Sequence, residues 1–336
     1  MPKTAANRNV FDWDRYGAYA LALLESTPLY RALLASSAVY RLRDVSFLGA
    51  LTLFSDRRQE SDSRFDHTVG VAYLMLRAAR GLGLSAADEK LLVAAAILHD
   101  VGHGALSHST ETYYRRRFSV DHKTFTKRII LGDLFIGREI SDLLRSHGVE
   151  PEFVAGFVNR LTGSPFEYLL HGPINVDTID GITRASRFFG ATRSFTRPDE
   201  ILSVLVDPSP QTQAPGDHFW HLKDSIYNSY IYRLEWAIYD SMITRALTVA
   251  HKKIVPDDFL LSDTDFRRKF QNELHDVSGR YETRHAELVF EMRTQRELPK
   301  QAKRRQFKID ENCRLASSND IAKRYIEVKS TDVSRA

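Results

Sequence analysis

Apolar residues recur at the spacing of α-helices along most of this chain. Between residues 16 and 51, Ala20, Leu21 and Leu24 fall on one helical face, and Pro28 marks a helix start. Runs of alternating apolar and polar residues are few, so the predicted fold class is all-α. Further helices are predicted over residues 66–80, 85–99, 122–130, 137–146, 151–161, 176–189, 219–251 and 262–274.

The helix predicted after Ser85 is apolar on nearly all sides. Ser85 and Asp88 match a capping box, which places the helix start, and the run LLVAAAILH continues from it. A helix without a polar face belongs in the middle of a core. Its last turn carries His99, Asp100 follows, and Gly102 ends the run. The central helix therefore delivers a histidine and an aspartate to one place.

Composition indicates a large soluble protein of the cytoplasm. With 43% hydrophobic and 27% charged residues, a chain of 336 residues can bury a sizeable core. No window approaches the roughly 18 consecutive apolar residues of a membrane span, and the charged N-terminus does not resemble a signal peptide. A single cysteine, Cys313, excludes an internal disulfide and fits a reducing compartment.

Charge and apolar content change after about residue 275. This shift predicts one domain over residues 1–275 and a charged, basic extension over residues 276–336. Residues 293–308 carry seven basic residues against one acidic, which makes them a candidate contact for nucleic acid. A solvated tail is favoured, because Phe307 is the only aromatic residue in the run.

The stretch of residues 94–108, AAAILHDVGHGALSH, concentrates the chemistry of the chain. It holds His99, Asp100, His103 and His108 within ten residues, interrupted by glycines. Successive residues on a helix point about 100° apart, so His99 and Asp100 cannot share one face of a continuous helix. We expect their side chains to converge because the helix ends before Gly102. This density of imidazole and carboxylate groups is typical of a metal and phosphate site.

A divalent transition metal needs ligands from several elements that converge. His67, near the start of the helix over residues 66–80, and Asp177 or Asp180 are candidates. A lone histidine on an amphipathic helix is more often a core or surface residue. Asp180 and Arg184 stand four residues apart, which also fits a simple structural ion pair.

The sequence resembles the HD superfamily of metal-dependent phosphohydrolases, and within it the deoxynucleoside triphosphate triphosphohydrolases. The resemblance covers roughly residues 28–270 and implies an HD-domain helical fold with its motif core at about residues 64–190. Its strongest segments are RFDHTVGV at residues 64–71, HDVGHGALSH at residues 99–108, and GPINVDTID at residues 172–180.

The resemblance assigns roles to individual residues. It makes His122 the general acid for the leaving oxygen, with Asp121 placed to orient it and His103 beside it in the catalytic group. It implies a divalent metal, one of Mn, Fe, Co, Ni or Zn, with Mg²⁺ as an additional ion. The implied metal ligands are His67, His99, Asp100 and Asp177, and the implied phosphate and substrate contacts are Arg64, His103, His108, Lys123, Lys223 and Tyr227.

Other positions depart from the family pattern. Lys123 stands where the family has a glutamate, and Phe47 stands where a glutamine contacts the sugar. Thr178, Gly181 and Ala185 replace a lysine, a tyrosine and an aspartate that hold the triphosphate and sugar. The sequence therefore predicts an intact metal shell with a remodelled substrate shell.

The predicted function is hydrolysis of a (deoxy)nucleoside triphosphate to nucleoside and triphosphate by a metal-dependent phosphohydrolase. Two alternatives stay open. One is a phosphodiesterase or nucleotidase acting on mono-, cyclic or oligonucleotide phosphate esters. The other is a nucleotide or nucleic-acid binder without turnover. The family resemblance also implies a homo-oligomer, and no membrane partner is expected.

Overall fold

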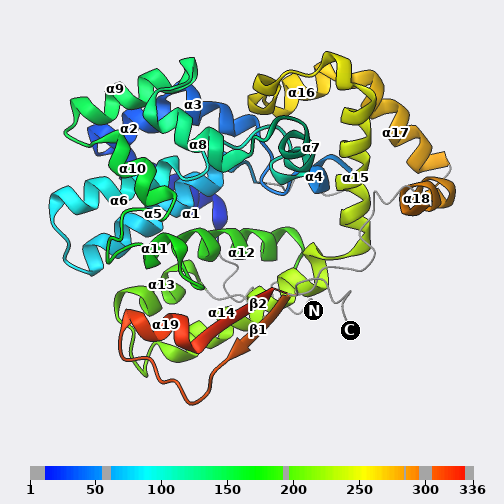
Figure 1. The fold of residues 1–336 in the computed structure, drawn as a ribbon. Coiled ribbons are helices and arrows are strands. Elements are labelled where there is room, and N and C mark those ends of the chain that lie inside the picture. The colour runs from blue at the N-terminus through cyan, green and yellow to red at the C-terminus, as the bar shows by residue number, and fades with distance from the viewer. Residues whose placement is uncertain (1–11, 55–61, 192–196, 284, 295–304, 330–336) are drawn as a thin grey trace, which may run out of the picture.

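The computed structural model describes residues 12–54, 62–191, 197–283, 285–294 and 305–329. These residues form an α-helical body with one two-stranded sheet, which confirms the predicted fold class (Figure 1). The first helices are α1 (Trp13–Glu25), α2 (Pro28–Ala35), α3 (Ser37–Tyr40), η1 (Arg41–Asp44), α4 (Ala50–Phe54), α5 (Arg64–Gly81), α6 (Ala86–Leu98), α7 (His108–Phe118), α8 (His122–Leu131), η3 (Phe135–Gly137), α9 (Arg138–Ser146) and α10 (Pro151–Val158).

The second half of the chain contains longer helices joined by short turns, and it ends on a β-hairpin. Its elements are α11 (Tyr168–His171), α12 (Val176–Phe188), α13 (Pro198–Val206), α14 (Gln213–Ile226), η5 (Tyr227–Ile231), α15 (Leu234–Val249), η6 (His251–Lys253), η7 (Pro256–Leu260), α16 (Asp263–Lys269), α17 (Gln271–Thr283), α18 (His285–Thr294), β1 (Arg305–Ile309), α19 (Ser318–Arg324) and β2 (Tyr325–Lys329).

Helices α5 and α6 form the centre of the larger core. Ser63 and Asp66 make a capping box that starts α5, and the Ser85 side chain accepts from the Asp88 amide to start α6. From Leu92 to Leu98 every residue of α6 is at most 1% exposed. The sequence prediction of a central helix is therefore confirmed, and the ends of α5 and α6 are held in fixed positions.

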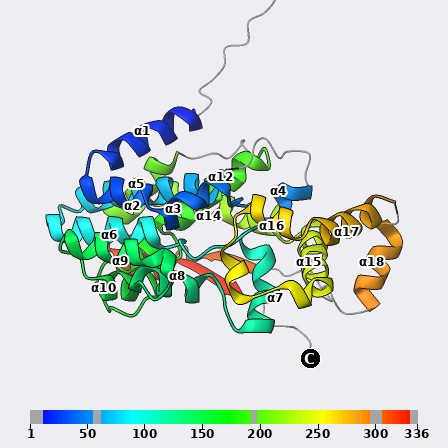
Figure 2. The same ribbon diagram turned by 90° about the horizontal axis from the view of Figure 1, so that it is seen from above.

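A second hydrophobic cluster lies under α4, α7 and α15 to α18. Its largest buried rings include Phe259, Phe266 and Phe270, with Tyr114 from α7. Figures 1 and 2 show these helices as a lobe on one side of the molecule. Helix α7 begins at His108, so the lobe also positions the second half of the histidine-rich stretch.

The long helix predicted over residues 219–251 is interrupted. A π-helical turn, η5, separates α14 from α15, and Arg233 caps the start of α15 in extended conformation. The aromatic rings of this turn pack on β1, where the rings of Tyr227 and Phe307 lie 5.6 Å apart. Packing against a strand distant in sequence explains why periodicity alone did not reveal the break.

The C-terminal hairpin packs into the main body. Strands β1 and β2 pair antiparallel, with Phe307 opposite Glu327. Tyr325 belongs to the larger core, and the Trp220 indole of α14 donates to the Lys308 carbonyl oxygen at 3.0 Å. The division at residue 275 stays a prediction. Residues 295–304 of the basic run lie outside the described residues, and residues 305–308 belong to β1.

Among the described residues, none of the helices is long and apolar enough to cross a membrane.

Candidate metal centre

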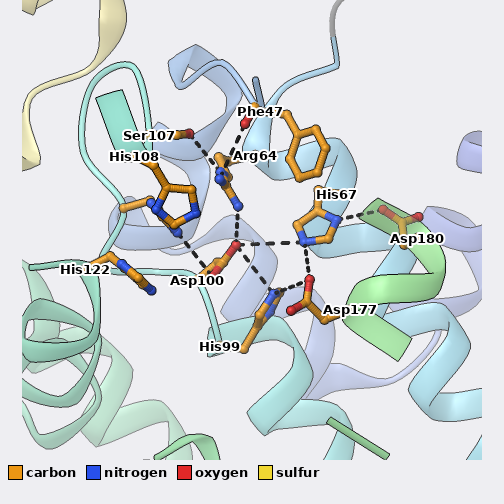
Figure 3. Close-up of polar contacts among 12 residues, drawn as sticks. Phe47, Arg64, His67, His99, Asp100, Ser107, His108, His122, Asp177 and Asp180 are labelled. Atoms are coloured by element: carbon orange, nitrogen blue, oxygen red, sulfur yellow. Dashed lines mark hydrogen bonds and ion pairs between the residues drawn. The ribbon is translucent and has the colours of Figure 1, made fainter. Parts of the chain in front are cut away.

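Three helix ends bring two histidines and two aspartates together (Figure 3). The first turn of α5 carries His67, and His99 caps the C-terminal end of α6 with Asp100 in the turn that follows. Asp177 comes from the first turn of α12, which Asn175 starts by a capping box. Because each side chain sits at a helix end, short turns let groups from different helices point at one place.

Four donor atoms converge in this cluster. His67 Nε2 lies 3.1 Å from Asp177 Oδ1 and 3.8 Å from Asp100 Oδ2. His99 Nε2 lies 3.5 Å from Asp100 Oδ2 and 4.0 Å from Asp177 Oδ1. The structure thus brings together all four residues that the sequence suggests as ligands. Asp177 is 44% exposed along its side chain, so the cluster opens to solvent on that side.

The donor set fits a divalent metal ion. Both Nε2 atoms are buried and make no hydrogen bond. Both Nδ1 atoms are engaged, that of His67 with Asp180 Oδ2 at 2.7 Å and that of His99 with the Ala96 carbonyl oxygen at 2.8 Å. Such a partner fixes the imidazole tautomer and leaves Nε2 as the ligand atom. Two imidazoles and two carboxylates suit a transition metal.

The Asp180 carboxylate contacts both His67 and Arg184. Its buried carboxylate oxygen Oδ2 lies 2.7 Å from His67 Nδ1 and 2.6 Å from Arg184 Nε. The ion pair between Asp180 and Arg184 is therefore real, and it also orients a candidate ligand. Burial lowers the pKa of His67, but the neighbouring carboxylates of Asp177 and Asp180 together outweigh burial and raise this pKa to about 9.

Gly70→Ala is expected to disrupt this arrangement. A Cβ at residue 70 would lie 1.8 Å from Asp180 Oδ1, so α5 and the carboxylate must separate. We expect a loss of about 1–3 kcal/mol of folding stability and metal binding about tenfold weaker or worse. Calorimetric unfolding and metal titration measure the two effects.

Gly17→Ala in α1 is the matched control for Gly70→Ala. No atom lies within 4 Å of its added Cβ, so the free energy of unfolding should rise by about 0.5–1 kcal/mol. Equal effects of the two substitutions would contradict the close-contact explanation.

Arg64 holds Asp100 in place from the other side. Its Nη1 lies 2.5 Å from Asp100 Oδ2, and its Nε donates to Ser107 Oγ at 2.8 Å. Burial raises the pKa of Asp100, but the neighbouring imidazoles of His99 and His103 and the charge of Arg64 hold it well below its usual range. Phe47 lies over the Arg64 guanidinium, with its ring 4.7 Å from that of His67, and forms an apolar wall.

A second group of imidazoles adjoins the first through Asp100. His103 Nε2 lies 3.4 Å from Asp100 Oδ1, and the rings of His103 and His122 stack at 4.2 Å. His108 lies edge-on to both rings. In the described part of the chain, two groups of side chains are able to hold an ion. One consists of His103, His108 and His122, and the other of His67, His99 and Asp100.

Glu111 is the carboxylate partner of these imidazoles that the sequence did not reveal. Its carboxylate lies 2.8 Å from His108 Nδ1 and 3.0 Å from His122 Nδ1. Asp121, the residue expected to orient His122, instead caps α8 by accepting from the Thr124 amide at 2.9 Å. The spacing of three residues between His108 and Glu111 was the available signal, but no helix is predicted from the sequence over α7, His108–Phe118.

The Glu111 contacts are expected to make stability fall in acid. Hydrogen bonds from His108 and His122 outweigh burial and hold the pKa of Glu111 well below its usual 4.5. Its contribution is therefore complete above about pH 4.5 and declines as the pH falls towards the lower folded value. Thermal unfolding of the wild type and Glu111→Gln should differ most near neutral pH and converge in acid. A difference independent of pH would contradict this assignment.

A strained turn sends the chain from His103 back to His108. Leu106 and Ser107 have φ values of 55° and 49°, which residues other than glycine seldom adopt. The buried Asp263 of α16 stabilises the turn, because its carboxylate accepts from the Leu106 amide at 2.7 Å and the Ser46 amide at 3.1 Å. Helix α16 thereby fixes the loop between His103 and His108.

The remaining predicted contacts lie elsewhere. Lys123 is exposed on the first turn of α8. Thr178 uses its hydroxyl in the Asn175 capping box. Lys223 and Tyr227 lie beneath the C-terminal hairpin, where Lys223 Nζ donates to the Pro173 carbonyl oxygen at 3.0 Å and the Tyr227 ring faces Phe307. The structure therefore places the candidate metal ligands next to the second group of imidazoles. Lys223 and Tyr227 lie in a neighbouring cluster.

Comparisons with known proteins agree with this geometry. Residues 64–158 match the HD domain family model. The chain is 27% identical over 230 residues to the uncharacterized protein YwfO of Bacillus subtilis, covering 66% of this chain and 50% of the relative. It is 23% identical over 259 residues to a deoxynucleoside triphosphate triphosphohydrolase SAMHD1 homolog of Dictyostelium discoideum, covering 70% and 46%.

The uncharacterized protein MG461 of Mycoplasma genitalium is 22% identical over 189 residues, covering 54% of this chain and 44% of the relative. The chain thus spans about half the length of the curated relatives it matches. The matched family segment runs from α5 to α10 and includes His67, His99 and Asp100. Residues 64–158 therefore contain an HD domain.

Proposed function

We propose that this protein is a metal-dependent phosphohydrolase that cleaves a (deoxy)nucleoside triphosphate to nucleoside and triphosphate. The observation that carries the proposal is the pair of buried, unbonded Nε2 atoms of His67 and His99 facing Asp100 and Asp177. The name of the Dictyostelium relative supports the choice of substrate.

His67, His99, Asp100 and Asp177 would hold the metal. When bound, such an ion supplies Lewis-acid stabilisation of phosphoryl charge and an activated water. Arg64 keeps Asp100 ionised and aimed at the centre through their short hydrogen bond. Because burial lowers the pKa of His103, with the charge of Arg64 adding to the effect, its ring stays neutral beside Asp100.

His122 supplies the proton to the leaving oxygen. Its Nδ1 lies 3.0 Å from a Glu111 carboxylate oxygen, which fixes the ring and leaves Nε2 as the atom that transfers the proton. The stacked ring of His103 fixes the plane of His122. Glu111 and His103 act as positioning groups in this arrangement, and His108 shares the Glu111 carboxylate.

A second candidate is a nucleotidase or phosphodiesterase acting on shorter phosphate esters. Phe47 and Gly181 favour it, because the wall beside His67 presents a phenyl ring and no polar group. A Cβ at Gly181 would lie 3.3 Å from Phe47 Cζ, so the two positions pack as one apolar surface. A sugar hydroxyl placed there gains no hydrogen bond.

Product analysis separates these functions. The purified chain is incubated with nucleoside tri-, di- and monophosphates and Mn²⁺, Fe²⁺, Co²⁺, Ni²⁺ or Zn²⁺, and products are resolved by ion-exchange chromatography. Inorganic triphosphate with free nucleoside supports the main proposal, whereas orthophosphate from monophosphates supports the second. Metal and nucleotide binding without any product would contradict both and favour a binding protein.

A further inference from the structure

Arg184 of α12 joins the first turn of α5 to the carboxylate that orients His67. Its Nε donates to Asp180 Oδ2 at 2.6 Å, and its Nη2 donates to the Asp66 carbonyl oxygen at 2.8 Å. Its Nη1 donates to Asp62 Oδ1 at 2.8 Å. The planar guanidinium therefore holds three acceptor groups in one fixed arrangement, which the single nitrogen of a lysine does not reproduce.

The Asp180 carboxylate connects this arrangement to the metal centre. Its Oδ2, which accepts from Arg184, also lies 2.7 Å from His67 Nδ1. Figure 3 shows Asp180 on the side of the His67 ring away from Asp100. A partner on Nδ1 sets the direction of Nε2, which is the ligand atom of this imidazole. The place of the Arg184 guanidinium therefore affects where His67 Nε2 points.

Trp13, the first residue of α1, covers this guanidinium. The Trp13 ring centroid lies 5.4 Å from the guanidinium carbon of Arg184 and 5.9 Å from that of Arg187. The attraction between a cation and an indole face is stronger where water is excluded. The side chain of Arg184 is 5% exposed and that of Asp180 0%, so the indole lies over a nearly dry ion pair. Figure 2 shows α1 on the outer side of the helical body.

The Trp13 ring also borders a cavity beside α1. The cavity has a volume of about 400 Å³, and its lining includes Trp13, Phe65, Arg184 and Arg187. A polar space of this size has room for water. Removal of the indole would widen it towards Arg184, and water would then compete with Asp180 for the guanidinium donors. Trp13 is therefore placed to keep the ion pair dry and its geometry fixed.

We propose that Trp13 is a positioning residue for the metal centre, and that docking of α1 raises the affinity of the centre for its metal ion. Trp13 holds the Arg184 guanidinium against Asp180, and Asp180 in turn orients His67. The inference rests on the metal centre of the proposed function and not on the choice of substrate. It gives a role in the site to α1, which lies outside the matched family segment of residues 64–158.

Manganese binding tests this assignment. Mn²⁺ is titrated calorimetrically into the metal-free full-length chain. We expect Trp13→Ala to weaken binding about threefold to tenfold, because the contact acts on His67 through two other side chains, whereas loss of a direct partner of a ligand costs about 10–100-fold. Trp13→Phe keeps an aromatic face over Arg184 and should restore most of the affinity.

Tyr19→Ala is the matched control for Trp13→Ala. Tyr19 is also an aromatic residue of α1, but its ring packs on that of Tyr73, with the centroids 6.0 Å apart. This variant should leave Mn²⁺ affinity unchanged. Thermal unfolding without metal establishes that each titrated variant is folded. Equal losses of Mn²⁺ affinity in Trp13→Ala and Tyr19→Ala would overturn the assignment to the Trp13 contact.

A double-mutant cycle with Arg184→Lys tests the route from Trp13 to His67. Lysine keeps the charge but loses the fork that holds Asp180, so Mn²⁺ binding should weaken about tenfold. If Trp13 acts through Arg184, adding Trp13→Ala to this variant should change the affinity less than about twofold. Fully additive losses would overturn the proposal. If Arg184→Lys does not fold, the comparison of Trp13→Ala, Trp13→Phe and Tyr19→Ala decides.

The wild-type titration separates failure of this inference from failure of the proposed function. A Trp13→Ala protein with a lower unfolding temperature and unchanged Mn²⁺ affinity would make Trp13 a packing residue, and only the present inference would fall. A wild-type chain that takes up no divalent transition metal would refute the metal centre, and with it both the proposed function and the role of Trp13.

Discussion

Asp177→Asn is expected to lower metal affinity at least about a hundredfold and kcat by about a thousandfold. The substitution keeps size and shape but removes one of the two carboxylates that neutralise a divalent ion, and Lewis-acid stabilisation is worth several kcal/mol. The side chain of Asp177 is 44% exposed, so the variant should fold. Metal content after dialysis and single-turnover hydrolysis measure the two losses.

Asp142→Asn on the exposed face of α9 is the matched control for Asp177→Asn, because it makes the same chemical change away from the centre. It should leave metal content and kcat unchanged. If the Asp177→Asn protein retains full metal content and activity, Asp177 is not a metal ligand. Another carboxylate must then complete the site.

His122→Ala is expected to lower kcat by about a thousandfold while leaving metal content unchanged. General acid catalysis contributes roughly 10²–10⁴ to a rate, and His122 is the imidazole that Glu111 holds at 3.0 Å. The loss should be smaller for a substrate whose leaving group needs no proton, such as a p-nitrophenyl ester. That dependence separates a proton donor from a residue that only fills space.

His251→Ala, at an exposed histidine of η6, is the matched control for His122→Ala. Glu111→Gln should reproduce part of the His122 defect, because the imidazole loses the carboxylate that positions it. Equal loss on activated and unactivated substrates would contradict the assignment of His122 as a general acid.

The sequence predicted the helical framework because its signals are local. Ser85 and Asp88 define the start of α6 within one turn, and Gly102 defines the end of the segment that carries His99 and Asp100. The candidate ligands could be named because a metal requires a few residue types and the motifs keep a recognisable order. Those signals do not require knowledge of the tertiary fold.

The missing features depend on contacts between distant segments. Glu111 holds His122 only because α7 and α8 meet, and no local pattern distinguishes Glu111 from the other charged residues of the chain. Strand β1 is short and basic, and its partner Trp220 lies 88 residues away in the chain. The placement of Arg305 and Glu327 beside Lys223 follows from that docking, which no local pattern encodes.

The Asp263 carboxylate makes the exchange of two backbone amide protons depend on the position of α16. It accepts from the backbone amides of Leu106 and Ser46, so neither amide proton can exchange with solvent deuterium until α16 releases them. Each release leaves a buried acceptor unsatisfied, at about 1–3 kcal/mol. The exchange rate at Leu106 would therefore record how often the lobe of α15 to α18 separates from the histidine loop.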